Sequence, residues 1–167
     1  MKGLILAGGT GSRLRPLTYT LPKQMIPIAG KPPLEHAVEK FRGAGINDIG
    51  IILGEQWHDT IKDHFEDGSD FGVDITYIYQ GEPLGLAHAV GCAEQFIGDE
   101  TFVVYLGDDL IQYGLSTFVD QFDPDTYVGS LAVQHVEEPS RYGVINVDDH
   151  GDVIGLVEKP DDPPTDL

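Results

Sequence analysis

The sequence predicts an α/β fold with a mixed, mostly parallel sheet flanked by helices. Three observations point to it: short apolar runs recur along the 167 residues, helical patterns separate them, and glycine or proline marks most junctions. Strands that alternate with helices pair in parallel, and the helices then cover both faces of the sheet. Ligands of such folds bind beyond the carboxyl ends of the strands, so the loops that follow the strands are where chemistry is expected.

The first half of the chain is expected to hold three strands and two helices. Lys2–Leu6 is a short apolar run that ends at glycines, which predicts a strand. Pro33–Gly45 has apolar residues at helical spacing and glycines at its end, which predicts a helix. Asp48–Leu53 is rich in isoleucine and is expected to be a buried strand. Gln56–Phe65 repeats large apolar residues every four positions, as a helix does, and Asp74–Tyr79 alternates in the manner of a strand.

The second half continues the alternation and then changes. Leu84–Phe96 is expected to be a helix, Phe102–Leu106 a second fully apolar strand, and Leu115–Phe122 a short helix. Beyond these, turns separate three further expected strands, which are Tyr127–Val136, Tyr142–Val147 and Val153–Val157.

The chain is acidic and holds one cysteine. Its 28 Asp and Glu against 10 Lys and Arg give a formal net charge of −18, which repels nucleic acids and anionic membranes. Because Cys92 is alone, a disulfide within the chain and a cysteine-based zinc site are excluded. No apolar run approaches the roughly 20 residues of a membrane span, and the N-terminal run is too short for a signal peptide. We therefore expect a cytoplasmic protein that binds neither nucleic acid nor membranes.

The charge is also unevenly distributed. Low lysine with high aspartate favours solvation in very high salt, as in halophiles, over binding of cationic partners. Residues 1–42 nevertheless contain seven Lys and Arg and two acids, a net charge of +5. Such an island predicts a local anion site, although a surface acidification that spared one segment would leave the same pattern.

A glycine-rich loop follows the first expected strand directly. Gly8, Gly9 and Gly11 would let backbone N–H groups surround a phosphate, and Arg13 would fork onto its oxygens. The spacing is not the dinucleotide-binding fingerprint, whose third glycine would fall at Leu14, and no Walker A loop is present. By spacing alone, a tight turn with an incidental arginine fits equally well.

The wider sequence around this loop strongly resembles the sugar-nucleotide pyrophosphorylases, which are nucleotidyltransferases that act on sugar-1-phosphates. Within that family it looks most like the glucose-1-phosphate thymidylyltransferases. The resemblance is long and specific, and its segments keep the family's order and approximate spacing. They read AGGTGSRLRPLT at 7–18, LPKQ at 21–24, QGEPLGLA at 80–87, LGDD at 106–109, RYGV at 141–144 and EKP at 158–160.

The resemblance implies a role for each matching residue on the nucleotide side. Arg13 would hold the departing pyrophosphate, and Lys23 would lie between the nucleotide α-phosphate and the sugar phosphate, screening two anions that otherwise repel. The amide of Gln80 would read a pyrimidine edge, since it can both donate and accept. The residues implied to contact the nucleotide are Leu6, Gly8, Gly9, Thr10, Gly11, Gln80 and Gly85.

The resemblance further implies a metal ligand and a sugar site. Asp108 would be catalytic as a ligand of Mg²⁺, which proteins hold with one or two carboxylates plus substrate phosphates. Asp109 departs from the asparagine common in thymidylyltransferases at that position. On the sugar side, Gly143 would allow close approach, Glu158 would accept hydrogen bonds from hydroxyls, and Lys159 would bind the sugar phosphate. No functional role is expected for the six histidines, of which His88, near the base loop, is the least certain.

These expectations combine into one picture of the chain. Residues 1–167 would form a single Rossmann-like nucleotidyltransferase domain with a nucleotide-binding part and part of the sugar-binding site. Its substrates would be dTTP or UTP and glucose-1-phosphate, and it would yield a nucleotide sugar and pyrophosphate. We expect the chain to be truncated at its C-terminal side, and homo-oligomers are a further expectation. The alternatives are a uridylyl- or guanylyltransferase of the same family, or a non-catalytic module that binds nucleotides or sugar phosphates.

Overall fold

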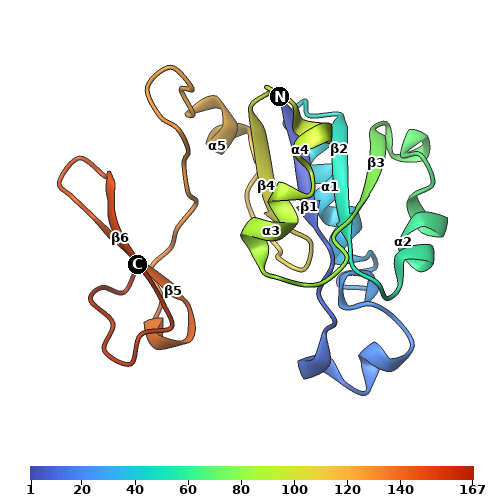
Figure 1. Ribbon diagram of the computed structural model, residues 1–167, viewed down its shortest axis with the longest axis horizontal. Coiled ribbons are helices and arrows are strands. Elements are labelled where there is room, and N and C mark those ends of the chain that lie inside the picture. The colour runs from blue at the N-terminus through green and yellow to red at the C-terminus, as the bar shows by residue number, and fades with distance from the viewer. The chain divides into compact units, whose positions relative to one another are not determined.

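A computed structural model describes residues 1–167, and it divides into two units, Met1–Pro124 and Asp125–Leu167 (Figure 1). Each unit has its own sheet, so each is described by itself. The expectation of one domain over residues 1–167 stays a prediction. None of the helices has the length and apolar character that a membrane crossing requires.

Four parallel strands form the sheet of the first unit: β1 (Lys2–Leu6), β2 (Asp48–Leu53), β3 (Asp74–Tyr79) and β4 (Phe102–Leu106). Their order across the sheet is β3-β2-β1-β4, so β1 lies in the interior. Leu6 therefore pairs with Ile52 on one side and with Leu106 on the other. This register brings the carboxyl ends of β1, β2 and β4 to the same edge, and it confirms the expected parallel sheet.

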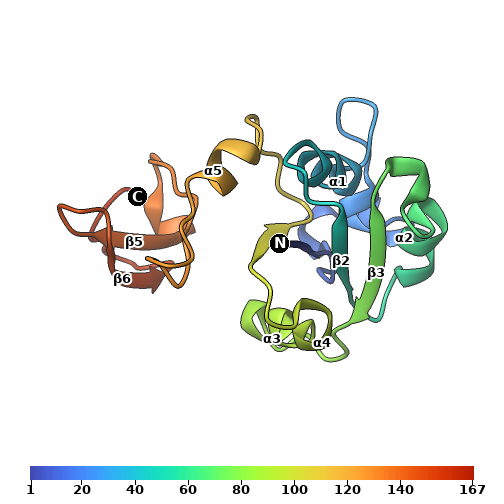
Figure 2. The same cartoon turned by 90° about the horizontal axis from the view of Figure 1, so that it is seen from above.

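Helices cover both faces of this sheet. Figure 2 shows α1 (Pro33–Gly43) and α2 (His58–Phe65) on one face, and α3 (Leu86–Gly91) and α4 (Glu94–Ile97) on the other. A fifth helix, α5 (Ser116–Asp120), follows β4, and Leu115 just before it is buried in the core on the α1 face. Short 3₁₀ turns occur at Ser12–Leu14, Leu17–Tyr19, Lys23–Met25 and Ser69–Phe71 in this unit and at Pro139–Arg141 in the second.

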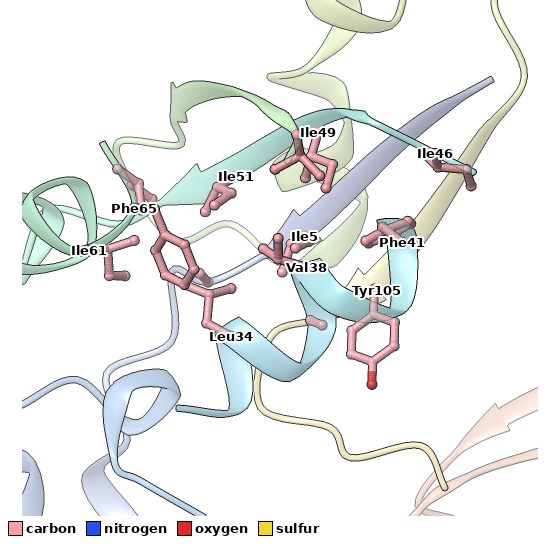
Figure 3. Packing of buried hydrophobic residues seen from close by; sticks show 14 of the residues in the cluster. Ile5, Leu34, Val38, Phe41, Ile46, Ile49, Ile51, Ile61, Phe65 and Tyr105 are labelled. Atoms are coloured by element: carbon pink, nitrogen blue, oxygen red, sulfur yellow. The ribbon is translucent and has the colours of Figure 1, made fainter. Parts of the chain in front are cut away.

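The side chains of the sheet alternate between two apolar cores. Ile5 of β1 and Ile51 of β2 point into the larger core, where they pack with Phe41 of α1 (Figure 3). Leu6 and Ile52 point to the other face and pack against α3 and α4. Because both faces are covered, successive residues of these strands are apolar, which is the pattern that predicted them.

All four expected helices differ from the structure at their ends or middle: Pro33–Gly45 ends at Gly43, and Leu115–Phe122 spans only Ser116–Asp120. Gln56–Phe65 was expected to be helical throughout, but the helix begins at His58 because Trp57 has a left-handed backbone, with φ +66°. Leu84–Phe96 is not one helix: it divides into α3 and α4, and Gly91 lies at the end of the first. Glycine is a poor helix former, so the chain bends there and turns apolar residues of both pieces onto the sheet.

The second unit is a hairpin with extended chain around it. β5 (Gly143–Val147) and β6 (Val153–Glu158) pair in antiparallel fashion, close to the expected bounds. The expected strand Tyr127–Val136 does not form. No strand pairs with this segment, and a strand gains stability from neighbours that pair with it and cover one face, so most of its apolar side chains stay exposed.

Candidate active site

The loops after β1 and β4 meet at the carboxyl edge of the sheet. The backbone N–H of Gly107 donates to the carbonyl of Leu6 at 3.0 Å, which holds the two strand ends together. The glycine-rich loop, residues 7–11, leaves from one of these ends, and Asp108 leaves from the other. Parallel pairing thus brings together two segments that lie a hundred residues apart in the sequence.

The glycine loop lies directly against Lys23. A Cβ at Gly9 would fall 2.9 Å from Lys23 Cε, and a Cβ at Gly11 would fall 3.0 Å from Lys23 Cβ. Gly11 also has a positive φ of +64°, and its carbonyl accepts a hydrogen bond from Thr18 Oγ1 at 2.8 Å. Close packing and backbone conformation therefore both favour glycine at position 11, whereas at position 9 an added side chain would displace the end of the Lys23 side chain.

Gln24 anchors this contact from beneath. Its side chain is buried, and its Nε2 donates to the carbonyl of Ala7 at 2.9 Å. Its Oε1 is buried without a hydrogen-bond partner. The amide thus ties the 3₁₀ turn Lys23–Met25 to the start of the glycine loop, and so fixes where the neighbouring Lys23 emerges.

Lys23 and Asp108 form an ion pair across the two loops. Lys23 Nζ donates to Asp108 Oδ2 at 2.5 Å, and both side chains are partly open to solvent. Burial and the negative charge of Asp108 raise the pKa of Asp109, while Lys23 opposes that shift. Two adjacent carboxylates and an ammonium group therefore share one edge of the sheet, and negative charge there is only partly compensated.

The basic island of residues 1–42 separates into two groups in space. Lys31 pairs with Glu39, and Lys40 donates to the carbonyls of Gln112 and Tyr113. Lys2 forms ion pairs with Glu100 and Asp48. Arg42 donates to the carbonyl of Phe71. The cations beside the glycine loop are three: Arg13, Arg15 and Lys23. Fewer cations are therefore available for the predicted anion site than the seven counted along the sequence.

Arg13 and Arg15 follow the glycine loop and are exposed. Arg13 forms no ion pair, and the guanidinium of Arg15 lies over the ring of Tyr19, 5.3 Å from its centroid. Thr10, Arg15, Tyr19 and Trp57 line an open cavity of about 420 Å³ beside the loop, together with Thr18 and Gln56. No carboxylate lines this cavity, although the chain is strongly acidic.

Gln80 and Gly85 lie at the other end of the glycine loop. Gln80 follows β3, and its Nε2 donates to the carbonyl of Gly85 at 3.1 Å. Its Oε1 faces Gly8, where an added Cβ would come within 3.2 Å of it. Gly85 has φ +106°, a conformation that favours glycine. The residues expected to contact a nucleotide thus form one continuous edge from Gln80 to Asp108.

Sequence reasoning assigned no role to His88, yet it contacts Gln80. His88 Nδ1 lies 3.3 Å from Gln80 Nε2, and His88 Nε2 lies 3.9 Å from the sulfur of Cys92. The i, i+4 spacing of His88 and Cys92 within the predicted helix was the available signal that both side chains share one face.

The groups available for a metal are oxygen ligands. No cluster of three or more His, Cys, Asp or Glu side chains surrounds a metal position. Asp108 and Asp109 alone offer carboxylates between the loops, and hard cations such as Mg²⁺ are held by one or two carboxylates completed by substrate oxygens. This donor set fits a divalent cation that binds together with a phosphate.

The residues expected to bind the sugar lie together in the second unit. Gly143 is paired with Glu158 in the β5-β6 register, and a Cβ on the glycine would approach Glu158 Oε2 to 3.2 Å. Lys159 donates its side chain to Glu158 Oε1 and its backbone N–H to the carbonyl of Tyr142. All three residues are exposed.

Comparison with known proteins gives consistent matches along the whole chain. The family described as nucleotidyl transferase matches residues 2–167. Over the full chain, 54% of residues are identical to the low-salt glycan biosynthesis nucleotidyltransferase Agl11 of Haloferax volcanii, and 46% to a glucose-1-phosphate thymidylyltransferase of Streptomyces antibioticus. A crystal structure of UDP-glucose pyrophosphorylase with UDP-glucose superimposes with a TM-score of 0.80 at 29% identity, covering 99% of this chain and 72% of that one.

These matches cover different shares of this chain and of its relatives. This chain is covered completely, but it spans about half the length of the curated relatives, 47% of each of the two named above. The match to a Haloferax protein supports the halophile interpretation of the acidic composition.

Proposed function

Because the chain belongs to the nucleotidyl transferase family, we propose that it carries the nucleotide-binding and part of the sugar-binding apparatus of a sugar-1-phosphate nucleotidyltransferase. Its substrates would be a nucleoside triphosphate and a sugar-1-phosphate. The single observation that carries the proposal is the Lys23–Asp108 pair, which lies against the glycine loop at the carboxyl edge of a parallel sheet.

The proposed reaction exchanges one phosphorus–oxygen bond for another. A phosphate oxygen of the sugar-1-phosphate attacks the α-phosphorus of the triphosphate in line and forms the new P–O bond. The bond between the α-phosphorus and its bridging oxygen breaks, and the electron pair leaves with pyrophosphate. The nucleophile is already an anion, so no general base is required, and the work of the protein is positioning and charge neutralisation.

Two cations of the chain would supply that neutralisation. The packed glycine loop and the neighbouring Gln24 hold Lys23, so the position of its ammonium group is fixed before a substrate binds. Arg13 is exposed and unpaired with any carboxylate, so its guanidinium is available to a pyrophosphate that departs along the loop. The proposed roles therefore differ: Lys23 would bridge the two reacting phosphates, and Arg13 would hold the leaving group.

Asp108 would hold the metal, with Asp109 beside it. The oxygen-only donor set and the partly compensated negative charge fit Mg²⁺. When bound, Mg²⁺ would supply further neutralisation of the phosphate charge. Until then, Asp108 is neutralised by Lys23.

The names of the relatives narrow the substrates of the proposal. They are a glucose-1-phosphate thymidylyltransferase and a UDP-glucose pyrophosphorylase, which points to dTTP or UTP and to glucose-1-phosphate. Gln80 would read the pyrimidine, and Gly143, Glu158 and Lys159 would receive the sugar phosphate. We further propose that the protein works in the cytoplasm, where both substrates are soluble. The strong negative charge of the chain disfavours nucleic acids and anionic membranes as partners.

The proposal is tested by pyrophosphate release in multimolar KCl with Mg²⁺, crossing dTTP, UTP, GTP and ATP with glucose-1-phosphate and mannose-1-phosphate. We expect turnover with dTTP or UTP and glucose-1-phosphate. Lys23→Ala should lower the rate about 100-fold, by comparison with the loss of other preorganised electrostatic groups. Lys62→Ala removes the same charge from α2 and should leave the rate unchanged, so it is the matched control.

Other outcomes discriminate between the alternatives. Preference for GTP with mannose-1-phosphate would identify a guanylyltransferase. Nucleotide binding that Lys23→Ala weakens, without turnover on any pair, would contradict an active enzyme and support a binding module. If Lys23→Ala and Lys62→Ala lowered the rate equally, the proposed role of Lys23 in the site would be wrong.

A further inference from the structure

Gln80, Gly85, His88 and Cys92 form a closed hydrogen-bond network at the end of β3. Gln80 Nε2 has two acceptors within reach, the carbonyl of Gly85 at 3.1 Å and His88 Nδ1 at 3.3 Å. A primary amide carries two N–H donors, so both are used within the protein. The group of Gln80 that remains for a ligand is Oε1, which has acceptor lone pairs only.

The same contacts determine the tautomer of His88. Gln80 Nε2 can only donate, so His88 Nδ1 must accept, and the imidazole proton then resides on Nε2. That Nε2–H points toward the sulfur of Cys92 at 3.9 Å, and the thiol in turn reaches the backbone carbonyl of Gln80 at 3.9 Å. Each donor in the network therefore meets an acceptor, and the reverse orientation of the Gln80 amide would place its oxygen against the carbonyl oxygen of Gly85, which can only accept.

We infer that His88 is a positioning residue that locks the side-chain amide of Gln80, so that the site presents a hydrogen-bond acceptor and selects bases with an N–H at that edge. The imide N3–H of thymine and uracil fits this acceptor. The N3 of cytosine is itself an acceptor, and it would oppose Gln80 Oε1 lone pair to lone pair. The inference rests on the proposed function in that Gln80 is taken to meet the base.

The position of Oε1 places this acceptor beside the glycine loop. It faces Gly8, the first glycine of the loop, at a distance that a side chain on residue 8 would obstruct. His88 is partly buried on α3 next to the buried Ala89, so its ring is carried by a packed helix. A glutamine on the surface would rotate freely, whereas this one is held from two sides, which is the condition for reading donor against acceptor.

The first test needs no ligand. In ¹⁵N-labelled protein, the nitrogen shifts of the His88 ring should show Nε2 protonated and Nδ1 unprotonated at neutral pH. A ring protonated at Nδ1 would overturn the inference whatever the protein's function is. Substitution Cys92→Ser keeps a donor and an acceptor at this place and should preserve the tautomer.

The second test measures base selectivity with dTMP and dCMP as probes, by calorimetric titration of the same chain. The wild type should prefer dTMP. His88→Phe keeps a ring but removes one of the two acceptors, so only the Gly85 carbonyl still holds the Gln80 amide, which can then turn more readily and donate to cytosine. We expect the ratio of dTMP affinity to dCMP affinity to fall about 10-fold. Part of this change should be tighter binding of dCMP, because a hydrogen bond to the cytosine N3 would replace an unfavourable contact between two acceptors.

Two variants separate positioning from a structural effect. His88→Asn retains an acceptor close to the place of Nδ1 and should restore most of the ratio. His150→Phe makes the same change on the hairpin turn of the other unit and should leave it unaltered. Loss of both affinities in parallel, or a ratio that His88→Phe leaves intact, would overturn the inference. Failure of the proposed function has a different signature, because the wild type would then bind neither nucleotide although the ring tautomer was as expected.

Discussion

The two units of the chain support their functional residues in different ways. Residues Met1–Pro124 contain all but two of the buried apolar side chains, and the four-stranded sheet there is covered on both faces. Residues Asp125–Leu167 bury only two apolar side chains, those of Val144 and Ile145 on strand β5 of the two-stranded hairpin. A hairpin of two strands is marginal by itself, whereas a covered parallel sheet is the usual core of a stable domain.

The proposed functional residues of the two units therefore differ in how firmly the protein holds them. The glycine loop and Asp108 follow strands whose ends are tied to one another, and Lys23 lies on a turn that Gln24 ties to the glycine loop, so the core fixes their geometry. Glu158 and Lys159 stand on the exposed hairpin and are held mainly by each other and by Tyr142. The nucleotide side is therefore expected to be formed before a substrate arrives, and the sugar side to rely more on its ligands for order.

The largest effect should come from the core of the first unit. Phe41 is fully buried between α1 and the sheet, with its ring edge-on to Tyr105. Phe41→Ala should lower the free energy of unfolding by about 3–5 kcal/mol, as loss of a buried phenylalanine does. Trp57 is the single tryptophan and lies in this unit, so its fluorescence in a denaturant titration reports the change.

The control for this prediction is in the hairpin. Ile145→Ala removes one of the two buried apolar side chains of the second unit. This variant should destabilise β5 but leave the midpoint of the denaturant titration, followed by Trp57 fluorescence, unchanged. If Ile145→Ala moved that midpoint as far as Phe41→Ala does, the two units would share one cooperative transition and the contrast between them would be wrong.

A smaller effect is expected where the loop after β2 touches the glycine loop. A Cβ at Gly54 would fall 2.8 Å from the carbonyl oxygen of Gly8, which is backbone and cannot swing aside. Gly54→Ala should therefore displace the glycine loop and cost about 1–3 kcal/mol of stability, as overpacking does. Titration with dTMP should show weaker binding. Gly43→Ala is the control because nothing lies within 4 Å of a Cβ there, and equal losses in both variants would contradict the close approach.

The smallest effect should lie in the hairpin turn. Asp148 Oδ1 accepts hydrogen bonds from the backbone N–H groups of His150 and Asp152, each at 2.9 Å. Asp148→Ala should cost about 1 kcal/mol of local stability, since net hydrogen bonds contribute about that much. Faster amide exchange confined to β5 and β6 would confirm it. Asp148→Asn keeps an acceptor and should show less, and faster exchange in β1 would contradict the separation of the units.

The sheet was predictable because its signal is local and strong. Buried parallel strands such as Asp48–Leu53 are continuous apolar runs, and the glycines after Lys2–Leu6 mark a strand end whatever follows. The loop residues could then be located at one edge, since parallel strands end there together. The glycine loop and Asp108 could be placed near one another in this way, whereas the position of Lys23 followed only from the family resemblance.

The predictions that failed depended on contacts in space that the sequence pattern does not show. Tyr127–Val136 has apolar residues typical of a strand, but they say nothing about whether another strand lies beside it. The basic island was counted along the sequence, whereas Lys31 and Lys40 turn to other partners in space. His88 was overlooked because its meaning comes from Gln80, eight residues earlier on a different element.

Salt changes which charges a nucleotide meets at the glycine loop. At about 0.1 M salt the screening length is about 10 Å, so an approaching triphosphate interacts with the acidic surface well beyond the loop. At about 1 M it is about 3 Å, and only the groups in contact still count. The charges that remain effective are then the groups at the loop itself, where Arg13, Arg15 and Lys23 outnumber the carboxylates of Asp108 and Asp109. High ionic strength thereby turns a chain that repels anions as a whole into one that accepts them at a single edge.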